Sequence, residues 1–136
     1  MLRIYLVEDN PIIRENLSET LDELVGARIV GVAETELDAT EWLKECVVDW
    51  DLAIVDLFLK RGSGMRVVSD FRQRTATQKL VVLSNYASPE VRTECLRLVA
   101  DHVFDKSADV DALIDFCKSM ASSPGLTKGP NALPND

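Results

Sequence analysis

The feature that most constrains the fold of this chain is a repeated change in the spacing of its apolar residues. Several short runs rich in β-branched residues are apolar at consecutive positions, as in strands buried on both faces. The runs are residues 4–7, 29–33, 52–55, 80–83 and 103–104. Each is followed by apolar residues at helical spacing, in stripes that begin at Ile13, Ala39, Val67, Val91 and Val110. This alternation predicts an α/β protein with a doubly wound, five-stranded parallel sheet and five helices on its two faces.

Local signals mark where several of these helices begin. Asn10 and Ser88 each stand directly before a proline, which places a capping side chain ahead of a first helical position that proline tolerates. Either Ser107 or Asp109 is expected to cap the last helix. These signals support the helical stripes independently of the apolar pattern.

The length of 136 residues predicts one folded domain, over residues 1–120. Residues 121–136 are rich in Ser, Pro and Gly without apolar periodicity, which predicts a disordered tail. The three cysteines form no CxxC pair, so buried thiols in a reducing compartment are expected. The opening apolar run is too short for a signal peptide or a membrane span, and we therefore expect a cytoplasmic protein.

The charge of the chain bears on its partners. Asp and Glu number 23 against 15 Lys and Arg, which gives a formal net charge of −8. Binding to a phosphate backbone relies on clustered cations, so direct contact with nucleic acid is not expected. An acidic balance instead favours a partner protein or a bound divalent cation.

Charged and polar side chains follow the predicted strands at their carboxyl ends. Glu8 and Asp9 follow the first strand, Asp56 the third, Ser84 ends the fourth, and Lys106 comes just after the fifth. In an open parallel sheet these ends meet at the edge where ligands bind. Any one of these residues alone would be ordinary, as a helix cap or a solvated lysine. All five at strand ends predict a site.

The chemistry of this site follows from its charges. Three carboxylates in a small space repel one another, and a hard divalent cation with oxygen ligands, such as magnesium, removes the repulsion. Asp56 could then attack an electrophilic phosphorus atom, with Lys106 and Ser84 holding the oxygens of the transferred group. The residues therefore indicate acyl-phosphate formation on Asp56.

The chain resembles the receiver domain of bacterial two-component response regulators over residues 2 to about 120. The matching segments are Val7-Glu8-Asp9-Asn10-Pro11, Ile54-Val55-Asp56-Leu57 with Gly62-Ser63-Gly64, Val82-Leu83-Ser84-Asn85, and Phe104-Asp105-Lys106-Ser107. This resemblance implies a flavodoxin-like sheet with strand order 2-1-3-4-5. It further implies that Asp9 and Asp56 are direct magnesium ligands, that Glu8 acts through water, and that the backbone carbonyl of Phe58 is a further ligand.

For the phosphoryl group, the resemblance makes Asp56 the phosphoacceptor, Ser84 the hydroxyl that follows the phosphoryl oxygen, and Lys106 its cationic partner. The donor would be a phosphohistidine on a sensor histidine kinase or a histidine phosphotransfer protein. The chain would then be a self-phosphorylating and slowly self-dephosphorylating switch, not a turnover enzyme. It would signal through an unidentified downstream protein, without membrane contact, and a homodimer through the last two helices is one arrangement to test.

The chain departs from the family pattern in the region expected to switch. The position three before the lysine usually carries Tyr or Phe, but here it is Val103, with Phe104 next to it, and Ser107 stands where proline is common. Tyr86 could shield the acyl phosphate or be an ordinary half-buried ring. We expect the switching element to span residues 86–106, with Tyr86 or Phe104 replacing the missing aromatic, or with weak coupling.

Three other functions compete with a stand-alone receiver. The chain could be the receiver part of a longer DNA-binding transcriptional regulator. It could be a phosphohydrolase with an aspartyl nucleophile, but such enzymes usually carry a second acid two residues on, where this chain has Phe58. It could also be a degenerate receiver that acts only as a binding module, against which the intact acidic residues and Lys106 argue.

Overall fold

Strands and helices alternate throughout the computed structural model, which describes residues 1–45, 49–85 and 87–122. The strands are β1 (Arg3–Val7), β2 (Arg28–Ala33), β3 (Leu52–Val55), β4 (Lys79–Ser84) and β5 (His102–Asp105). The helices are α1 (Pro11–Val25), α2 (Glu36–Glu45), α3 (Gly64–Asp70), α4 (Pro89–Arg97) and α5 (Val110–Ala121). The five predicted strands are confirmed, with bounds that move by at most one residue at either end. Most of the predicted tail, residues 123–136, lies outside the described residues, so its disorder stays a prediction.

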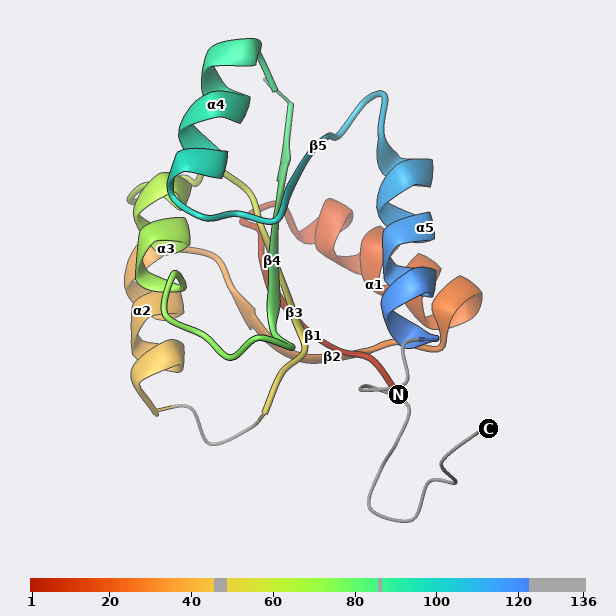
Figure 1. Ribbon diagram of the computed structural model, residues 1–136. Helices are drawn as coiled ribbons and strands as arrows, with labels where there is room; N and C mark the ends of the chain where they lie inside the picture. The colour runs from red at the N-terminus through yellow and green to blue at the C-terminus, as the bar shows by residue number, and fades with distance from the viewer. Residues whose placement is uncertain (46–48, 86, 123–136) are drawn as a thin grey trace.

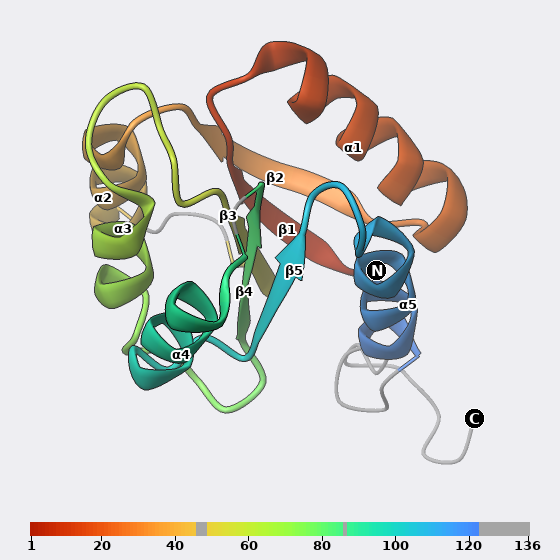
Figure 2. The same ribbon diagram turned by 90° about the horizontal axis from the view of Figure 1, so that it is seen from above.

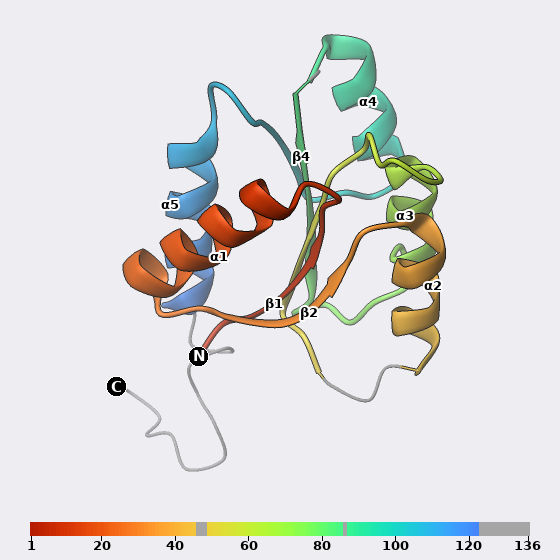
Figure 3. The same cartoon turned by 180° about the vertical axis from the view of Figure 1, so that it is seen from behind.

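The strands form one parallel sheet in the order β2-β1-β3-β4-β5, which confirms the expected doubly wound topology. Helices α1 and α5 cover one face of this sheet, and α2, α3 and α4 cover the other (Figures 1 and 2). The same two layers of helices are visible from behind in Figure 3. Among the described residues, no helix is both long enough and apolar enough to cross a bilayer.

Each face of the sheet has its own hydrophobic core. Leu21 of α1 and Leu113 of α5 are fully buried on one face. On the other face, Tyr5 stacks on Trp42 with ring centroids 3.8 Å apart. Gly31 on the edge strand makes this stack fit, because a Cβ atom there would lie 2.6 Å from the Trp42 indole nitrogen. The packing therefore requires a residue without a side chain in the middle of β2.

The predicted caps of two helices are present. The Asn10 side-chain oxygen accepts hydrogen bonds from two backbone N–H groups of the first turn of α1, at 2.9 and 3.2 Å. The Ser88 hydroxyl accepts one at 3.2 Å from the first turn of α4. These bonds satisfy donors that have no partner within the helix.

The prediction that Ser107 or Asp109 caps the last helix is confirmed for the position of Asp109, which is the N-cap residue of α5, but not for a capping side chain. Asp109 immediately precedes α5 but its side chain makes no capping bond. Its carboxylate instead accepts from the Asp105 backbone N–H at 2.9 Å and from the Arg92 guanidinium at 3.2 Å. The Ser107 hydroxyl donates to Asp105 at 2.5 Å. The Asp109 carboxylate thus contacts the preceding loop and a cation on α4, and the residue that supplies this cation lies 17 positions away in the sequence.

Candidate functional site

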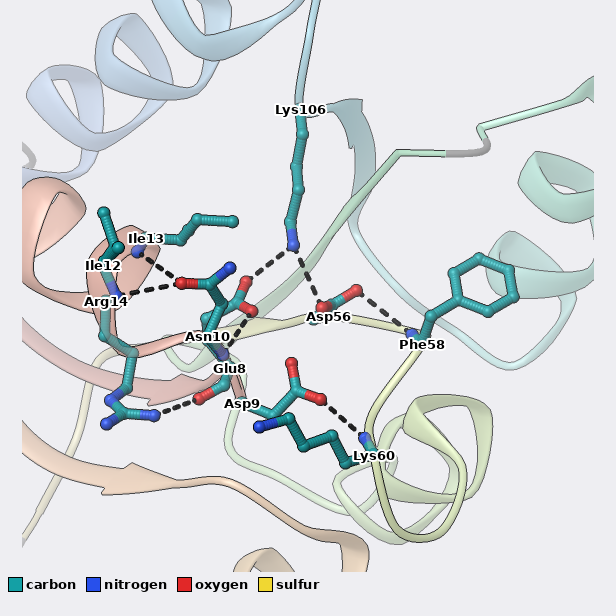
Figure 4. Close-up of polar contacts among 10 residues, drawn as sticks. All are labelled: Glu8, Asp9, Asn10, Ile12, Ile13, Arg14, Asp56, Phe58, Lys60 and Lys106. Atoms are coloured by element: carbon teal, nitrogen blue, oxygen red, sulfur yellow. Dashed lines mark hydrogen bonds and ion pairs between the residues drawn. The ribbon is translucent and has the colours of Figure 1, made fainter.

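Charged side chains converge where β1, β3 and β5 end (Figure 4). The register sets Val7 beside Val55, and the Asp56 backbone N–H continues the pairing with a 2.9 Å bond to the Val7 carbonyl. On the other side, the Lys106 backbone N–H donates to the Ser84 carbonyl at 2.9 Å. The backbone of the site is therefore an extension of the sheet, which fixes where these side chains begin.

Glu8, Asp9 and Asp56 form the acidic cluster, in which one carboxylate oxygen from each lies within 4.8 Å of the other two. Glu8 is 2% exposed and Asp56 5%, whereas Asp9 is half-buried. The Lys106 ammonium lies 2.7 Å from Glu8 Oε1 and 3.0 Å from Asp56 Oδ2. Lys106 thus bridges the two buried acids of the cluster.

Burial and pairing act in opposite directions on the groups of this cluster. Burial raises the pKa of Glu8, although the hydrogen bonds from Lys106 and from the Asn10 N–H act to lower it. Burial alone would lower the pKa of Lys106, but its hydrogen bonds to Glu8 and Asp56 outweigh this and raise it. The ammonium is therefore held firmly in its charged form.

The donor set of the acidic cluster fits a hard divalent cation. All its donor atoms are oxygens, and they lie close enough together to share one ion. Asp9 Oδ2 accepts from the Lys60 backbone N–H at 2.6 Å, and Asp56 Oδ1 accepts from the Phe58 N–H at 3.1 Å. The loop after β3 therefore orients two of the three carboxylates. The Phe58 carbonyl as a metal ligand stays a prediction.

Ser84 lies at the carboxyl end of β4 and is fully buried. It is therefore part of the same sheet edge as the acidic cluster, as the sequence predicts. Its role toward a phosphoryl oxygen stays a prediction, and Tyr86 lies outside the described residues.

The loop after β3 is shaped by residues for which no structural role was predicted. Gly64 begins α3 against the site, and a Cβ atom there would lie 2.0 Å from the Asp56 carbonyl oxygen. Gly62 has a left-handed φ of 85°. The Glu36 carboxylate, from the start of α2, accepts from the Ser63 N–H at 2.9 Å. The glycines were visible as a matching segment, but Glu36 lies 27 residues from its partner and carried no signal.

Val103 and Phe104, the candidates for the switch, point to opposite faces of the sheet. Val103 belongs to the core beneath α4 with Cys95, whereas Phe104 belongs to the core beneath α5, with its ring centroid 6.1 Å from that of Phe116. Adjacent strand residues alternate in direction, so Phe104 cannot fill the space of the missing aromatic by a rotamer change. A different side chain contacts this part of β5: the Arg92 guanidinium, from α4, donates to the Val103 carbonyl at 2.8 Å.

A family model described as the response regulator receiver domain matches residues 4–118. The chain belongs to the response regulator receiver family. Response regulator UvrY of Escherichia coli (strain K12) is 21% identical over 122 residues, which cover 90% of this chain and 55% of that protein. The chain thus spans about half the length of the curated relatives it matches, and the activities of those longer proteins are not transferred to it.

Solved receiver structures share the fold. The signal receiver domain of a DNA-binding response regulator from Colwellia psychrerythraea 34H has a TM-score of 0.78 at 20% identity, over 90% of this chain and all of that one. A response regulator from Burkholderia pseudomallei, solved with a phosphorylated aspartic acid, a calcium ion and citrate, has a TM-score of 0.74 at 20% identity, over 90% of this chain and 69% of that one. The fold of this receiver domain is flavodoxin-like.

Membership of this family gives the acidic cluster a general meaning. Receiver domains act in two-component systems as signalling switches, interact with histidine kinases or phosphotransfer proteins, and bind a divalent metal in an acidic pocket. In this receiver, Glu8, Asp9 and Asp56 form an acidic cluster whose carboxylate oxygens lie close enough together to hold one ion.

Proposed function

We propose that this receiver is a phosphoacceptor switch in which Asp56 accepts a phosphoryl group, with magnesium, from a phosphohistidine on a sensor kinase or phosphotransfer protein. The observation that carries the proposal is the position of Lys106. Its ammonium lies 3.0 Å from Asp56 Oδ2 in an acidic cluster that can hold a cation. A nucleophilic carboxylate, a cation for the transferred group and a metal pocket therefore coincide.

The transfer step is a displacement at phosphorus. An Asp56 oxygen bonds to the phosphorus atom while the phosphorus–nitrogen bond of the phosphohistidine breaks, and the leaving imidazole takes a proton from solvent. Bound magnesium, held by Asp9, Asp56, the Phe58 carbonyl and, through water, Glu8, would neutralise charge on the phosphoryl oxygens. Lys106 stays hydrogen-bonded to Glu8 and turns its remaining N–H donors to a phosphoryl oxygen. The Ser84 hydroxyl donates to another.

The product of this step remains attached to the protein, which distinguishes a switch from a turnover enzyme. Phe58 stands where aspartyl phosphohydrolases usually place an acid, and this residue is 54% exposed. A phenyl ring neither donates nor accepts a proton in the hydrolysis of an acyl phosphate. We therefore assign slow self-dephosphorylation to this receiver and no catalytic turnover.

Phosphorylation of purified protein tests the proposal. Acetyl phosphate with magnesium should add one phosphoryl group to the wild-type protein, detected by intact mass, and peptide mapping should place it on Asp56. The group should be lost in alkali, as an acyl phosphate is. Asp56→Asn should take no label there, whereas the matched Asp51→Asn variant should be labelled normally. An alkali-stable phosphoester on Ser84, or a folded wild-type protein that takes no label, would contradict the assignment.

The signal would travel through the segment between Ser84 and Lys106, and Arg92 supports this path. From α4 its guanidinium contacts the Ala87 carbonyl at 3.1 Å, the Val103 carbonyl at 2.8 Å and the Asp109 carboxylate at 3.2 Å. It therefore ties the loop after β4, strand β5 and the start of α5 to one side chain. A local charge change needs such an element to be felt elsewhere. We assign to Arg92 the coupling that an aromatic at position 103 would otherwise supply.

A second candidate function is that of a receiver within a longer DNA-binding regulator. The transcriptional regulatory protein PhoP of Escherichia coli (strain K12) favours it, because this chain covers only 58% of that protein. The net charge of −8 argues that any DNA contact would come from another segment and not from this domain. Intact mass of the protein isolated from its source distinguishes the two, because a mass well above the 15.1 kDa of this chain would support the longer regulator.

A further inference from the structure

Arg14, on the first turn of α1, contacts the acidic cluster from outside. Its Nη1 atom donates to the Glu8 carbonyl oxygen at 2.9 Å and lies 2.7 Å from Glu34 Oε2 (Figure 4 shows the bond to Glu8). The Arg14 side chain is 19% exposed, and Glu34 directly follows β2. One guanidinium therefore links the first turn of α1, the end of β1 and the end of β2.

We propose that Arg14 is a positioning residue of the metal site, which acts by holding the peptide unit between Glu8 and Asp9. This inference rests on the proposed function, because it assumes that the acidic cluster binds magnesium. Arg14 contacts no carboxylate of that cluster in any hydrogen bond or ion pair recorded for the described residues. Its effect on the metal is therefore indirect.

Because the peptide unit is planar, the bond from Arg14 to the Glu8 carbonyl also affects the position of Asp9. The Glu8 carbonyl and the Asp9 nitrogen belong to one rigid plane, so a bond that fixes the carbonyl also fixes where the Asp9 side chain starts. Two other bonds complete the arrangement: the Asn10 N–H donates to Glu8 Oε2 at 3.1 Å, and the Lys60 N–H donates to Asp9 Oδ2 at 2.6 Å. Arg14 contributes a side-chain contact to the backbone of this acidic pair, whereas the other two bonds reach its carboxylates.

Charge and position predict opposite effects of removing Arg14. Its loss takes a positive charge from the neighbourhood of the metal pocket, which by electrostatics alone would tighten magnesium binding. Loss of positioning frees the Glu8–Asp9 peptide and weakens binding, and outer contacts of this kind are typically worth 10–100-fold in metal affinity. Because the pair with Glu34 already balances the arginine, we expect position to dominate and affinity to fall about tenfold in Arg14→Ala.

Calorimetric titration with magnesium chloride decides between these effects, together with the melting temperature of each metal-free variant. Arg97→Ala is the matched control, since it removes the same charge from an exposed pair with Glu94 and should leave the magnesium affinity unchanged. Arg14→Lys keeps the charge and a donor, so it should recover part of the lost affinity, whereas Arg14→Gln, neutral and shorter, should not. Glu34→Gln leaves the bond to Glu8 and should weaken binding less than Arg14→Ala.

The outcomes separate this inference from the proposed function. A wild-type protein that binds no magnesium would overturn both. If the wild-type protein binds and Arg14→Ala binds equally or more tightly, the positioning role is wrong while the proposed function stands. A lower metal-free melting temperature with unchanged affinity would likewise make Arg14 merely structural and overturn the inference. Should Arg14→Ala fail to fold, the order of affinities for Arg14→Lys and Arg14→Gln decides.

Discussion

Acidic side chains lie at both the amino-terminal and the carboxyl edge of the sheet, but their cationic partners differ. At the amino-terminal edge, Asp51 and Asp101 each bind an arginine side chain. Asp51 accepts from the Arg3 guanidinium at 2.9 and 3.0 Å and from the Arg3 backbone N–H at 2.8 Å. Asp101 accepts from Arg74 and from the Leu80 N–H, both at 2.8 Å. Both of these acids therefore have a cation at hydrogen-bond distance, and their bonds join the starts of neighbouring strands.

At the carboxyl edge, the two buried acids Glu8 and Asp56 share the ammonium of Lys106, and the Asp9 carboxylate lies beside them. The acids there are held close together by backbone N–H groups, but their charges are not balanced. The comparison teaches that buried acids in one domain serve two purposes. Acids that bind an arginine join neighbouring strands. Three acids beside one lysine leave a deficit of positive charge that a ligand can fill.

Magnesium should have the largest effect, because it supplies the missing charge at the carboxyl edge. At a concentration about one hundred times its dissociation constant, it should raise the free energy of unfolding of the wild-type protein by about 2.7 kcal/mol. Urea denaturation with and without magnesium measures this. Asp9→Asn should lose most of this gain. If magnesium leaves the stability of the wild-type protein unchanged, the carboxyl edge has no deficit of positive charge for a metal to fill.

Asp51→Asn should weaken the amino-terminal edge. The substitution keeps the size of the side chain but leaves Arg3 with only the exposed Asp49 as a charged partner, and we expect the free energy of unfolding to fall by about 2 kcal/mol. Asp49→Asn is the control, because Asp49 is 85% exposed and 3.9 Å from Arg3, so its loss should cost no more than about 0.5 kcal/mol. Equal effects of the two substitutions would show that the Arg3–Asp51 pair is not special.

The same substitution at the other edge should have the opposite sign. In the metal-free protein, Asp56→Asn removes two repulsions and the cost of burying a carboxylate, while Lys106 keeps Glu8 at 2.7 Å. We expect the free energy of unfolding to rise by about 1 kcal/mol. Chemical denaturation in the presence of a chelator measures it. If Asp56→Asn instead lowers the free energy of unfolding as much as Asp51→Asn does, Lys106 already neutralises the charge of the acidic cluster.

Arg92→Ala should have the smallest effect on stability and a clear effect on coupling. The Arg92–Asp109 pair is partly exposed, so its loss should cost under about 1 kcal/mol. With beryllofluoride and magnesium bound, hydrogen exchange in the wild-type protein should change across residues 87–106. In Arg92→Ala the changes should contract toward the pocket, while Arg97→Ala should behave as wild type. If the wild-type changes never leave the pocket, the switch segment is wrongly assigned.

Most of the fold was predictable because its signals are local. A strand buried on both faces needs consecutive apolar residues, as in 52–55, and a helix covering a sheet needs a stripe, as from Val110. The acids at strand ends were predictable as a group because parallel strands end at one edge. The absence of a side-chain capping bond at α5 was not predictable, because the Asp109 carboxylate contacts Arg92, a residue 17 positions away in the sequence.

The sequence by itself determined the alternation of strands and helices, the strand ends that carry Glu8, Asp56 and Lys106, and the family to which these segments belong. Only the tertiary structure decided which charges meet. It paired Asp51 with Arg3, placed Lys106 between two acids, and brought Arg14 to the Glu8 carbonyl. The physical reason is range: apolar periodicity and capping act within a few residues, whereas an ion pair joins whichever side chains the packed helices and strands bring within about 4 Å.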